Sequence, residues 1–545
     1  MKTRIGRPFL RSAFVLMTMA LVCFGLLPKA DAVNPQPDGG YPGLNTAEGQ
    51  DALFNLTTGG CNTALGWHTL RGDTAGSFNT AVGAGALLAN TADSNTGTGT
   101  AALLNNTTGI QNTANGAFAL VSNYGGYQNT ASGYQALYHN TTGPSNTANG
   151  TYALFSNTTG VENTAIGASA LQSNTVASQN TATGAAALKD NTTGLQNTAN
   201  GHSALERNTT GSFNTAVGKS ALESNTTARF NTATGFEALL LNTTGESNTA
   251  VGYGALHNNA TGGANTAIGD GTLRSSGTSG ANTAMGYHAL IFNSGNGNVA
   301  IGVLALEQNT SGGSSNAAIG NSALQQNHAG SDNVALGDYA GWNQTSGSGN
   351  VYIGKDIRGV DGENNSCYIR GIFGNTSPGG TAVFINGKGK LGTTTSSRRF
   401  KEDIKPMNNA SEALFDLQPV TFRYKKQIDP KSLPQFGLIA EDVEKVSPDL
   451  VVRDKDGKIN TVRYDQVNAM LLNEFLKEHK TVEAQQVTIV QLKSKAATQE
   501  VTISELKKQM SVLTAQLKEQ ALQIQKVSAQ VQMRKPLASV AHSNP

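Results

Sequence analysis

A repeat of about seventeen residues occupies the first two thirds of this chain of 545 residues. Its consensus is N-T-A-x-G-x-x-A-L-x-x-N-T-T-G-x-x, as in the copy that starts at Asn79. The opening asparagine recurs from Asn45 to Asn350 in 18 intervals, so the mean spacing is close to 17 residues. A fixed period of this length is typical of a solenoid, in which each unit contacts its neighbours and no single unit folds alone.

Each copy is predicted to form one or two short strands and two turns. Glycine or asparagine recurs too often for a helix of ~10 residues, whereas N-T-A-V-G is a short, alternating and partly β-branched segment. The glycine at the fifth position can adopt a positive φ, and N-T-T-G supplies a second turn through its asparagine and glycine. Coils stacked at the ~4.8 Å spacing of strands would align the asparagines in ladders and the Ala, Leu, Val and Ile positions in an apolar column.

The apolar column that such coils form is thin. Each unit contributes alanine, leucine and one aliphatic residue or threonine, and burial returns only ~25 cal/mol per Å² against ~1–2 kcal/mol per residue for ordering the backbone. We therefore expect the repeat to need lateral partners. The N-T-A-[VI]-G segments resemble the left-handed β-roll heads of trimeric autotransporter adhesins, although the coil length and the turn differ. The resemblance implies three chains packed side by side, and a lone parallel β-helix is the alternative.

Composition excludes several classes of function. Only 14% of the residues are charged and 6% are aromatic, while glycine numbers 63, which argues against an ordinary globular enzyme. Residues 396–545 hold 23 Lys and Arg against 18 Asp and Glu, an excess too small to indicate nucleic-acid binding. The histidines of the repeat stand singly and no glycine cluster has the context of a phosphate-binding loop, so no metal and no cofactor are predicted. The Asn-Thr-Thr sequons are interpreted as turn chemistry, with glycosylation as the minor alternative.

The N-terminus has the pattern of a secretory signal peptide. Four basic residues precede an apolar stretch over 14–27, and an Ala-x-Ala cleavage motif follows at 30–32. We predict a signal peptide over 1–32. An uncleaved anchor helix is the alternative, although the apolar run is shorter than the ~20 residues of a spanning helix. Only Cys61 and Cys367 then remain, which is no disulfide framework. The predicted product is secreted or displayed at the cell surface, without a membrane span once the signal is removed.

Changes of composition mark further boundaries. A short linker over 33–44 precedes the repeat, which is assigned to 45–350. Strand-like pieces separated by glycines follow and are interpreted as a β-rich neck over 351–395. Charged residues then become frequent, and a small α+β domain is predicted over 396–474. The remaining residues are assigned to a coiled coil, over 475–533, and a disordered tail, over 534–545.

The C-terminal region carries the apolar spacing of a coiled coil. Apolar residues recur alternately four and three positions apart, in one register, for eight heptads. Gln485, Gln499 and Gln520 occupy seam positions, where they cost stability and fix the register. This spacing does not by itself separate two strands from three. The apolar seam positions are Phe475, Val482, Ile489, Leu492, Ala496, Ile503, Leu506, Met510, Leu513, Leu517, Ile524, Val527 and Val531.

A set of ordered motifs begins at Ser396. Lys401 lies five positions after this serine and the basic residue Arg399 lies between them. The motifs that follow are Phe436-Gly437-Leu438-Ile439-Ala440-Glu441-Asp442-Val443, Pro448-Asp449-Leu450-Val451, Val462-Arg463-Tyr464-Asp465 and the helix start around Leu471-Leu472. This stretch, over about 396–480, resembles the intramolecular chaperone domain of phage endosialidases and tail fibres, a family of self-cleaving serine peptidases. It departs from the family pattern at Ser397, where Asp is common, which bears on the efficiency of cleavage more than on the fold.

The same residues carry a chemical argument. A serine hydroxyl is a poor nucleophile until a base takes its proton. No histidine lies in 396–474, and His479 belongs to the following helix, so a lysine is the base at hand. Burial, or neighbouring cations such as Arg398 and Arg399, would favour a neutral amine, and a positioned base contributes ~10²–10⁴ in rate. The resemblance implies that the bond between Thr395 and Ser396 is broken, with Ser396 as nucleophile and Lys401 as general base.

These features together predict a secreted or surface-displayed homotrimeric fibre. The coiled coil would gather the chains and the chaperone domain would align them, so that the β-roll forms from a seed. Ser396 and Lys401 would then cut each chain once. The alternative is a non-cleaving surface adhesin or structural binding module that keeps its C-terminal domain. A turnover glycan hydrolase ranks last because 45–350 holds no paired carboxylates, and no glycan or protein ligand can be named.

Overall fold

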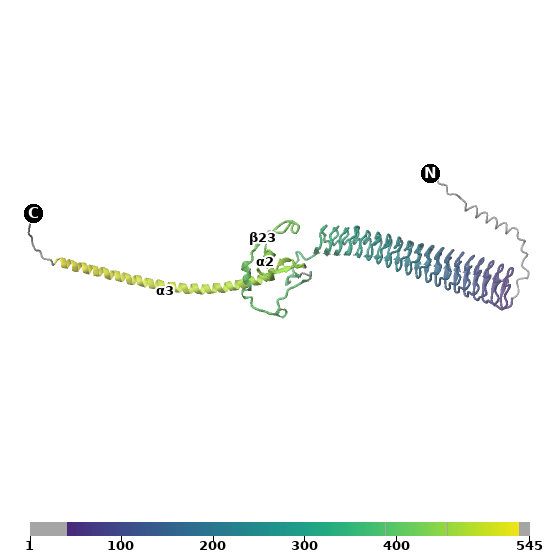
Figure 1. Cartoon of the computed structure of the whole chain (residues 1–545), viewed down its shortest axis with the longest axis horizontal. Coiled ribbons are helices and arrows are strands. Elements are labelled where there is room, and N and C mark those ends of the chain that lie inside the picture. Colours follow the sequence, from purple (N-terminus) through teal and green to yellow (C-terminus); the bar gives the residue numbers. More distant parts are fainter. Residues whose placement is uncertain (1–40, 387–388, 455, 534–545) are drawn as a thin grey trace, which may run out of the picture. The chain divides into compact units, whose positions relative to one another are not determined.

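The chain forms two compact units, which divide between Asn375 and Thr376 (Figure 1). The computed structural model describes residues 41–386, 389–454 and 456–533. The first unit is a parallel β-solenoid, and the second is a small α+β domain that ends in a long helix. The predicted signal peptide over 1–32 and tail over 534–545 lie outside the described residues.

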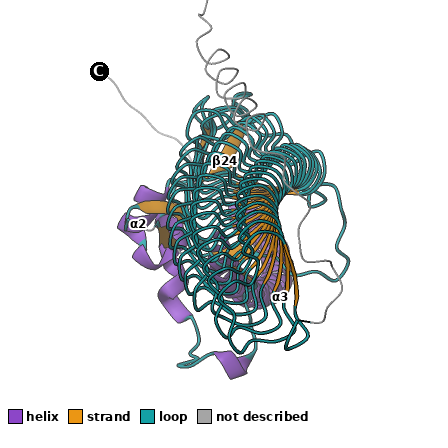
Figure 2. Ribbon diagram, turned by 90° about the vertical axis from the view of Figure 1, so that its right-hand side faces the viewer, coloured by secondary structure: helices purple, strands orange, loops and turns teal. Residues whose placement is uncertain are grey.

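The solenoid contains one three-residue strand per coil in the part of the chain that is described. Each strand pairs in parallel with the next, with equivalent residues of successive repeats in register, and together they form one curved sheet along one face of the unit (Figure 2). The strands are β1 (Thr46–Glu48), β2 (Thr63–Leu65), β3 (Thr80–Val82), β4 (Thr96–Thr98), β5 (Thr113–Asn115), β6 (Thr130–Ser132), β7 (Thr147–Asn149), β8 (Thr164–Ile166), β9 (Thr181–Thr183), β10 (Thr198–Asn200), β11 (Thr215–Val217), β12 (Thr232–Thr234), β13 (Thr249–Val251), β14 (Thr266–Ile268), β15 (Thr283–Met285), β16 (Val299–Ile301), β17 (Ala317–Ile319), β18 (Val334–Leu336), β19 (Val351–Ile353) and β20 (Cys367–Ile369). The solenoid therefore continues for two coils beyond the start of the predicted neck.

The apolar core lies inside the coils of a single chain. Side chains alternate along a strand, so the middle alanine points inward while the first and third residues face outward. A typical coil buries this alanine and an Ala-Leu pair in the following turn, as Ala114, Ala119 and Leu120 do with no exposed surface. The thin apolar column, which we expected to need lateral partners, is thus enclosed within one chain.

Two asparagine ladders run through the interior, as the repeat predicts. In the first, Oδ1 of Asn112 accepts the backbone N–H of Asn129, at 3.0 Å, and its side-chain amide, at 3.1 Å. In the second, which uses the asparagine of N-T-T-G, the amide of Asn140 donates to Oδ1 of Asn123 at 2.8 Å. The first ladder also donates to the carbonyl that follows N-T-T, as in the 2.9 Å bond from Asn129 to Gly143. These bonds satisfy buried polar groups and add to stability beyond the thin apolar core.

The two glycines of the repeat play different parts. The glycine after the strand adopts a positive φ, as predicted, and Gly116 has a φ of +146°. A Cβ at Gly116 would also lie 2.4 Å from the carbonyl oxygen of Gly133. The glycine of N-T-T-G was predicted to turn the chain, but Gly109 and Gly126 are absent from the positive-φ region, and Ala177 occupies the same position in another coil. This position requires a small residue rather than a left-handed backbone.

The core leucine of each coil occupies the left-handed region, which the sequence did not predict. Leu120 has a φ of 52° and Leu154 a φ of 50°, and both are fully buried. This conformation costs about 1–2 kcal/mol per residue, which burial of a leucine offsets with ~1.5–3 kcal/mol. Because β-branched side chains are poorly tolerated there, the constraint explains why the repeat uses leucine rather than valine or isoleucine.

At the C-terminal end of the solenoid, a large residue replaces the small alanine of the strand and a glycine replaces the core leucine. Tyr352 takes the place of the strand alanine in β19 and is fully buried, while Gly341 takes the place of the preceding leucine with a φ of +63°. A Cβ at Gly341 would lie 2.7 Å from the Tyr352 ring. The Tyr352 hydroxyl donates to Gln344 Oε1, and its ring stacks on Tyr368 of β20 with centroids 5.7 Å apart. Burial is the main cause that raises the pKa of Tyr352 to about 12.

The second unit opens with short elements. Its antiparallel strand pairs are β21 (Phe384–Ile385) with β22 (Leu391–Gly392), β23 (Val420–Arg423) with β24 (Pro434–Gly437), and β25 (Val451–Arg453) with β26 (Ile459–Val462). The helices are the 3-10 segments η1 (Arg398–Phe400), η2 (Asn408–Asp416) and η3 (Pro448–Leu450), then α2 (Ala440–Val446) and α3 (Tyr464–Gln532). The turn between β25 and β26 has Gly457 at a φ of 80°.

Helix α3 continues the α+β domain without a break at the predicted boundary of 474/475. Only Met470, in its first two turns, is buried. The heptad positions that follow are exposed in the single chain, as shown by Leu506 at 55% and Leu517 at 59%. Every described residue of α3 from position 478 on is exposed, so this part of the helix carries a seam that is available for other helices.

Candidate functional site

The segment with the predicted cleavage site is an exposed, irregular stretch between β22 and η1. Thr395 and Ser396 lie outside regular structure and are both exposed. The short helix η1 follows directly, and its first turn is closed by the backbone bond from Phe400 to Ser397, at 3.0 Å. The peptide bond between Thr395 and Ser396 is therefore accessible and free of strand pairing.

The structure places Lys401 one helical turn after Ser396 and leaves both side chains exposed. Lys401 is the C-cap of η1, where its backbone N–H donates to Arg398 at 3.1 Å. Among the described residues, no hydrogen bond joins the Ser396 hydroxyl to the Lys401 amine. Arg399 lies over the ring of Phe400, with 4.6 Å between the guanidinium carbon and the ring centroid. The burial that would favour a neutral lysine is therefore not provided by one chain.

The motifs that follow the serine meet in one small core. Val443 of α2, Leu450 of η3 and Val451 of β25 are buried together with Val462 of β26 and Met470 of α3. Each belongs to a predicted motif or to the predicted helix start. The ordered motifs are thus the residues that hold the domain together rather than residues that line a catalytic cleft.

A polar network that the sequence did not predict joins η2 to α3. Ser411 is fully buried, and its hydroxyl donates to a Glu474 carboxylate oxygen while accepting the Asn473 amide at 2.6 Å. Lys477 pairs with Glu474 at 2.8 Å, and this bond is the main cause that holds the pKa of Glu474 below its usual range. The network fixes the start of the long helix on the domain. Its residues are separated by more than sixty positions in sequence, and no motif relates them.

Comparison with known families decides the nature of this unit. Residues 396–452 match the peptidase S74 family, described as chaperone of endosialidase. The chain thus contains a chaperone-of-endosialidase domain. No curated protein and no solved structure matches the chain.

The chaperone-of-endosialidase match begins at Ser396, the residue predicted to open the domain. It ends at Val452, within β25, so β26 and α3 lie beyond it. The match supports the domain identity predicted from the motifs. The roles of Ser396, Lys401, Arg398 and Arg399 stay predictions.

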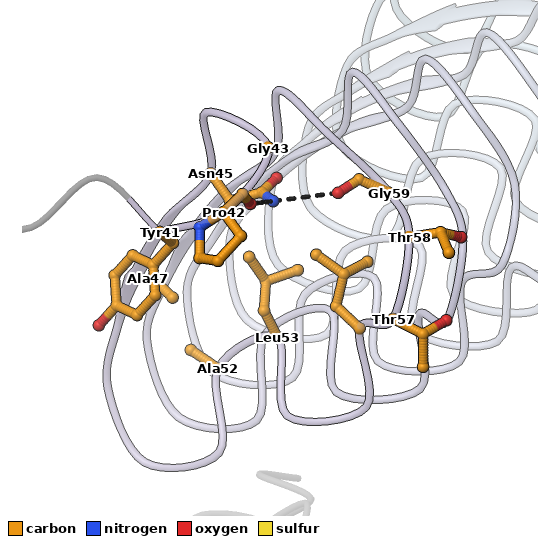
Figure 3. Close-up of a pocket in the computed structure, with 11 residues that line it drawn as sticks. Tyr41, Pro42, Gly43, Asn45, Ala47, Ala52, Leu53, Thr57, Thr58 and Gly59 are labelled. Carbon is orange, nitrogen blue, oxygen red and sulfur yellow. Dashed lines mark hydrogen bonds between the residues drawn. The ribbon is translucent and has the colours of Figure 1, made fainter.

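The solenoid offers no competing chemical site in its described part. A hollow of about 330 Å³ opens at its N-terminal end and is lined by residues such as Leu53 and Leu56. Asn45 donates across it to the Gly59 carbonyl at 3.0 Å (Figure 3). This hollow is the open mouth of the first coil, and its described lining contains no carboxylate, histidine or cysteine.

Among the described residues, no group of three His, Cys, Asp or Glu side chains could hold a metal ion. None of the described helices has the length and apolar character needed to cross a membrane. The sequon asparagines Asn106, Asn140 and Asn157 are fully buried, and each amide nitrogen is bonded within the second ladder. These nitrogens are inaccessible in the folded coil.

Proposed function

We propose that this chain is an exported fibre protein whose chaperone-of-endosialidase domain guides assembly of three copies and then separates itself from the fibre. The observation that carries the proposal is that the family match starts at Ser396, directly after an exposed and unpaired peptide bond. The exposed heptads of α3 support association of several chains. The N-terminal signal pattern supports a secreted or surface location.

The proposed cleavage is an intramolecular acyl shift followed by hydrolysis. The Ser396 hydroxyl attacks the carbonyl carbon of Thr395 while the Lys401 amine takes its proton. The new C–O bond forms an ester, the C–N bond breaks, and the freed amine of Ser396 takes up a proton. Water then hydrolyses the ester, which leaves a carboxylate at Thr395 and restores the serine hydroxyl.

Assembly provides a reason for the cut to wait. Ser396 and Lys401 are exposed and not bonded to each other in one chain. A neutral lysine needs desolvation or a nearby cation, and a neighbouring copy packed over η1 supplies both. Cleavage then follows assembly, and the loss of residues 396–545 makes the folded fibre difficult to reverse.

Mass spectrometry and denaturing gels of the purified full-length protein test this proposal. The wild-type chain is expected to yield fragments that end at Thr395 and begin at Ser396, while Ser396→Ala stays whole. Ser397→Ala is the matched control and is expected to cleave. Lys401→Arg keeps the charge but removes a usable base, so it should stay whole, whereas Lys405→Arg should cleave. An assembled wild-type chain that remains intact would contradict self-cleavage and favour a permanent foot.

A further inference from the structure

The outward face of the solenoid sheet changes character along its length. In β4–β10 the third strand residue, which faces outward, is polar except at Ile166, as Asn115, Ser132 and Asn149 show, and Leu65 and Val82 precede this polar run. From β13 to β20 the same position is always aliphatic or methionine. We call these eight residues the apolar stripe: Val251, Ile268, Met285, Ile301, Ile319, Leu336, Ile353 and Ile369. In β16–β20 the first strand residue also changes, from threonine to Val299, Ala317, Val334, Val351 or Cys367.

The apolar stripe is continuous and open to solvent in the single chain. The register pairs Met285 with Ile301, Ile301 with Ile319 and Ile319 with Leu336, so equivalent side chains follow one another at each coil. Ile319 is 41% exposed and Leu336 is 48% exposed, although each lies between two neighbours of its own kind. Contiguous apolar surface on a soluble protein usually marks an interaction site.

The fold of one chain does not require the apolar stripe. The coils of β5–β7 carry polar residues at the same outward position, yet they have the same parallel pairing and bury the same alanines and leucine. The aliphatic residues of β13–β20 therefore contribute nothing to the core that asparagine or serine cannot replace. Their surplus apolar area is available to a partner.

The size of the apolar stripe indicates what kind of partner fits. Eight strands at ~4.8 Å give a length of roughly 35 Å, and with a width of ~10 Å the surface offers on the order of 350 Å². A stable complex of free proteins buries ~800 Å² on each partner. A partner for this stripe must therefore be held nearby by other contacts. The exposed heptads of α3 can hold one, because a parallel coiled coil keeps identical chains in register and raises their effective concentration.

The chemistry of the apolar stripe also suits a second copy. Neither outward column of β16–β20 contains a charged residue, so identical faces meet without repulsion between like charges. Charged residues lie beside the stripe, after the turn glycine, as at Asp338 and Lys355. An apolar centre with a polar edge is the usual composition of a protein interface.

We propose that copies of this chain pack against one another along the apolar stripe, over β13–β20, and that the coils before β11 stay separate. The inference rests on the proposed assembly through α3. It adds that the fibre is joined near its C-terminal half and divides into single solenoids toward the N-terminus, because six of the seven strands β4–β10 carry a polar residue at the outward position and present no continuous apolar surface.

Cysteine cross-linking of the full-length chain with a short bismaleimide linker tests this arrangement. The three native cysteines are replaced by serine, and Ser396→Ala keeps each chain whole. Single cysteines are then introduced as Ile319→Cys in the apolar stripe, as Ser132→Cys at the same strand position of a polar coil, and as Leu506→Cys in α3. Sheets packed face to face lie ~10 Å apart, so equivalent cysteines of copies that meet along the stripe come within reach of a short bismaleimide linker.

After treatment with the linker, Ile319→Cys and Leu506→Cys are expected to give cross-linked dimers on denaturing gels, with at least a tenfold lower yield for Ser132→Cys. If Leu506→Cys cross-links and Ile319→Cys does not, the apolar stripe faces something other than a second copy and the inference is wrong, while assembly through α3 stands. Equal yields from Ile319→Cys and Ser132→Cys would show that the chains join along their whole length. If neither Leu506→Cys nor Ile319→Cys cross-links, the proposed assembly fails and the inference with it.

Discussion

Replacement of one asparagine in the second ladder tests whether the ladders hold the solenoid together. Asn157 donates to Oδ1 of Asn140, at 2.8 Å, and accepts the Asn174 amide, at 2.9 Å. Asn157→Ala leaves the Asn140 oxygen and one Asn174 N–H buried without a partner. Each such group costs ~1–3 kcal/mol, so the expected loss is about 2–6 kcal/mol. Thr158→Ala is the matched control, because its hydroxyl donates to the Thr175 carbonyl at the partly buried edge and its loss costs only ~0.5–1.5 kcal/mol.

Hydrogen exchange read by mass spectrometry measures this loss where it occurs. In a solenoid each coil contacts its neighbours, so the opening should be confined to the coils of β6, β7 and β8, which hold Asn140, Asn157 and Asn174. At 1.4 kcal/mol per tenfold change, 2–6 kcal/mol corresponds to exchange that is roughly 30-fold to 10⁴-fold faster there. The coil of β14 should exchange at the wild-type rate. An Asn157→Ala chain that exchanges within threefold of Thr158→Ala would refute the structural role of the ladder.

Three further predictions follow from buried polar groups. Burial raises the pKa of Asp73 above its ordinary value of 3.8. The folded state therefore holds this proton more tightly than the unfolded chain and loses stability as the pH rises from 3.8 through the raised pKa. In urea titrations, Asp73→Asn should be more stable than wild type at pH 7, and the difference in unfolding free energy should close toward pH 3. Tyr352→Ala empties the last core position and should lower the free energy of unfolding by ~3–5 kcal/mol. Tyr352→Phe removes only the hydrogen bond to Gln344. Similar unfolding midpoints for the two variants would argue against a packing role of the ring. Ser411→Ala removes a donor to Glu474 and should lower the melting temperature of the C-terminal unit but not that of the solenoid, as followed by calorimetry.

Much of the solenoid follows from the repeat itself. Local spacing alone predicts the strand, the first glycine turn and both ladders, because each feature repeats within one coil and one neighbour. The expectation that the repeat needs lateral partners stays a prediction, although Ala114, Ala119 and Leu120 are already buried within one chain. The left-handed φ of Leu120 was missed because propensity rules assign that region to glycine and asparagine.

The candidate site was predictable to a different extent. The motifs after Ser396 identified the domain, and the structure gathers Val443, Leu450 and Val462 into its core. The Ser411 and Glu474 contact was not predictable, because it joins residues 63 positions apart that share no motif. The geometry that would activate Ser396 is likewise a matter of tertiary or intermolecular contacts, which linear spacing does not encode.

The variable length of a few coils has a consequence for how the length of such a fibre can evolve. The ladder bond from Asn95 to Asn79 spans 16 residues and that from Asn316 to Asn298 spans 18, yet neighbouring strands keep their register. Duplication or loss of a whole coil would therefore alter reach in steps of ~4.8 Å and leave every surviving bond intact. Unequal recombination within the gene can therefore change the number of coils without altering the C-terminal α+β domain or α3.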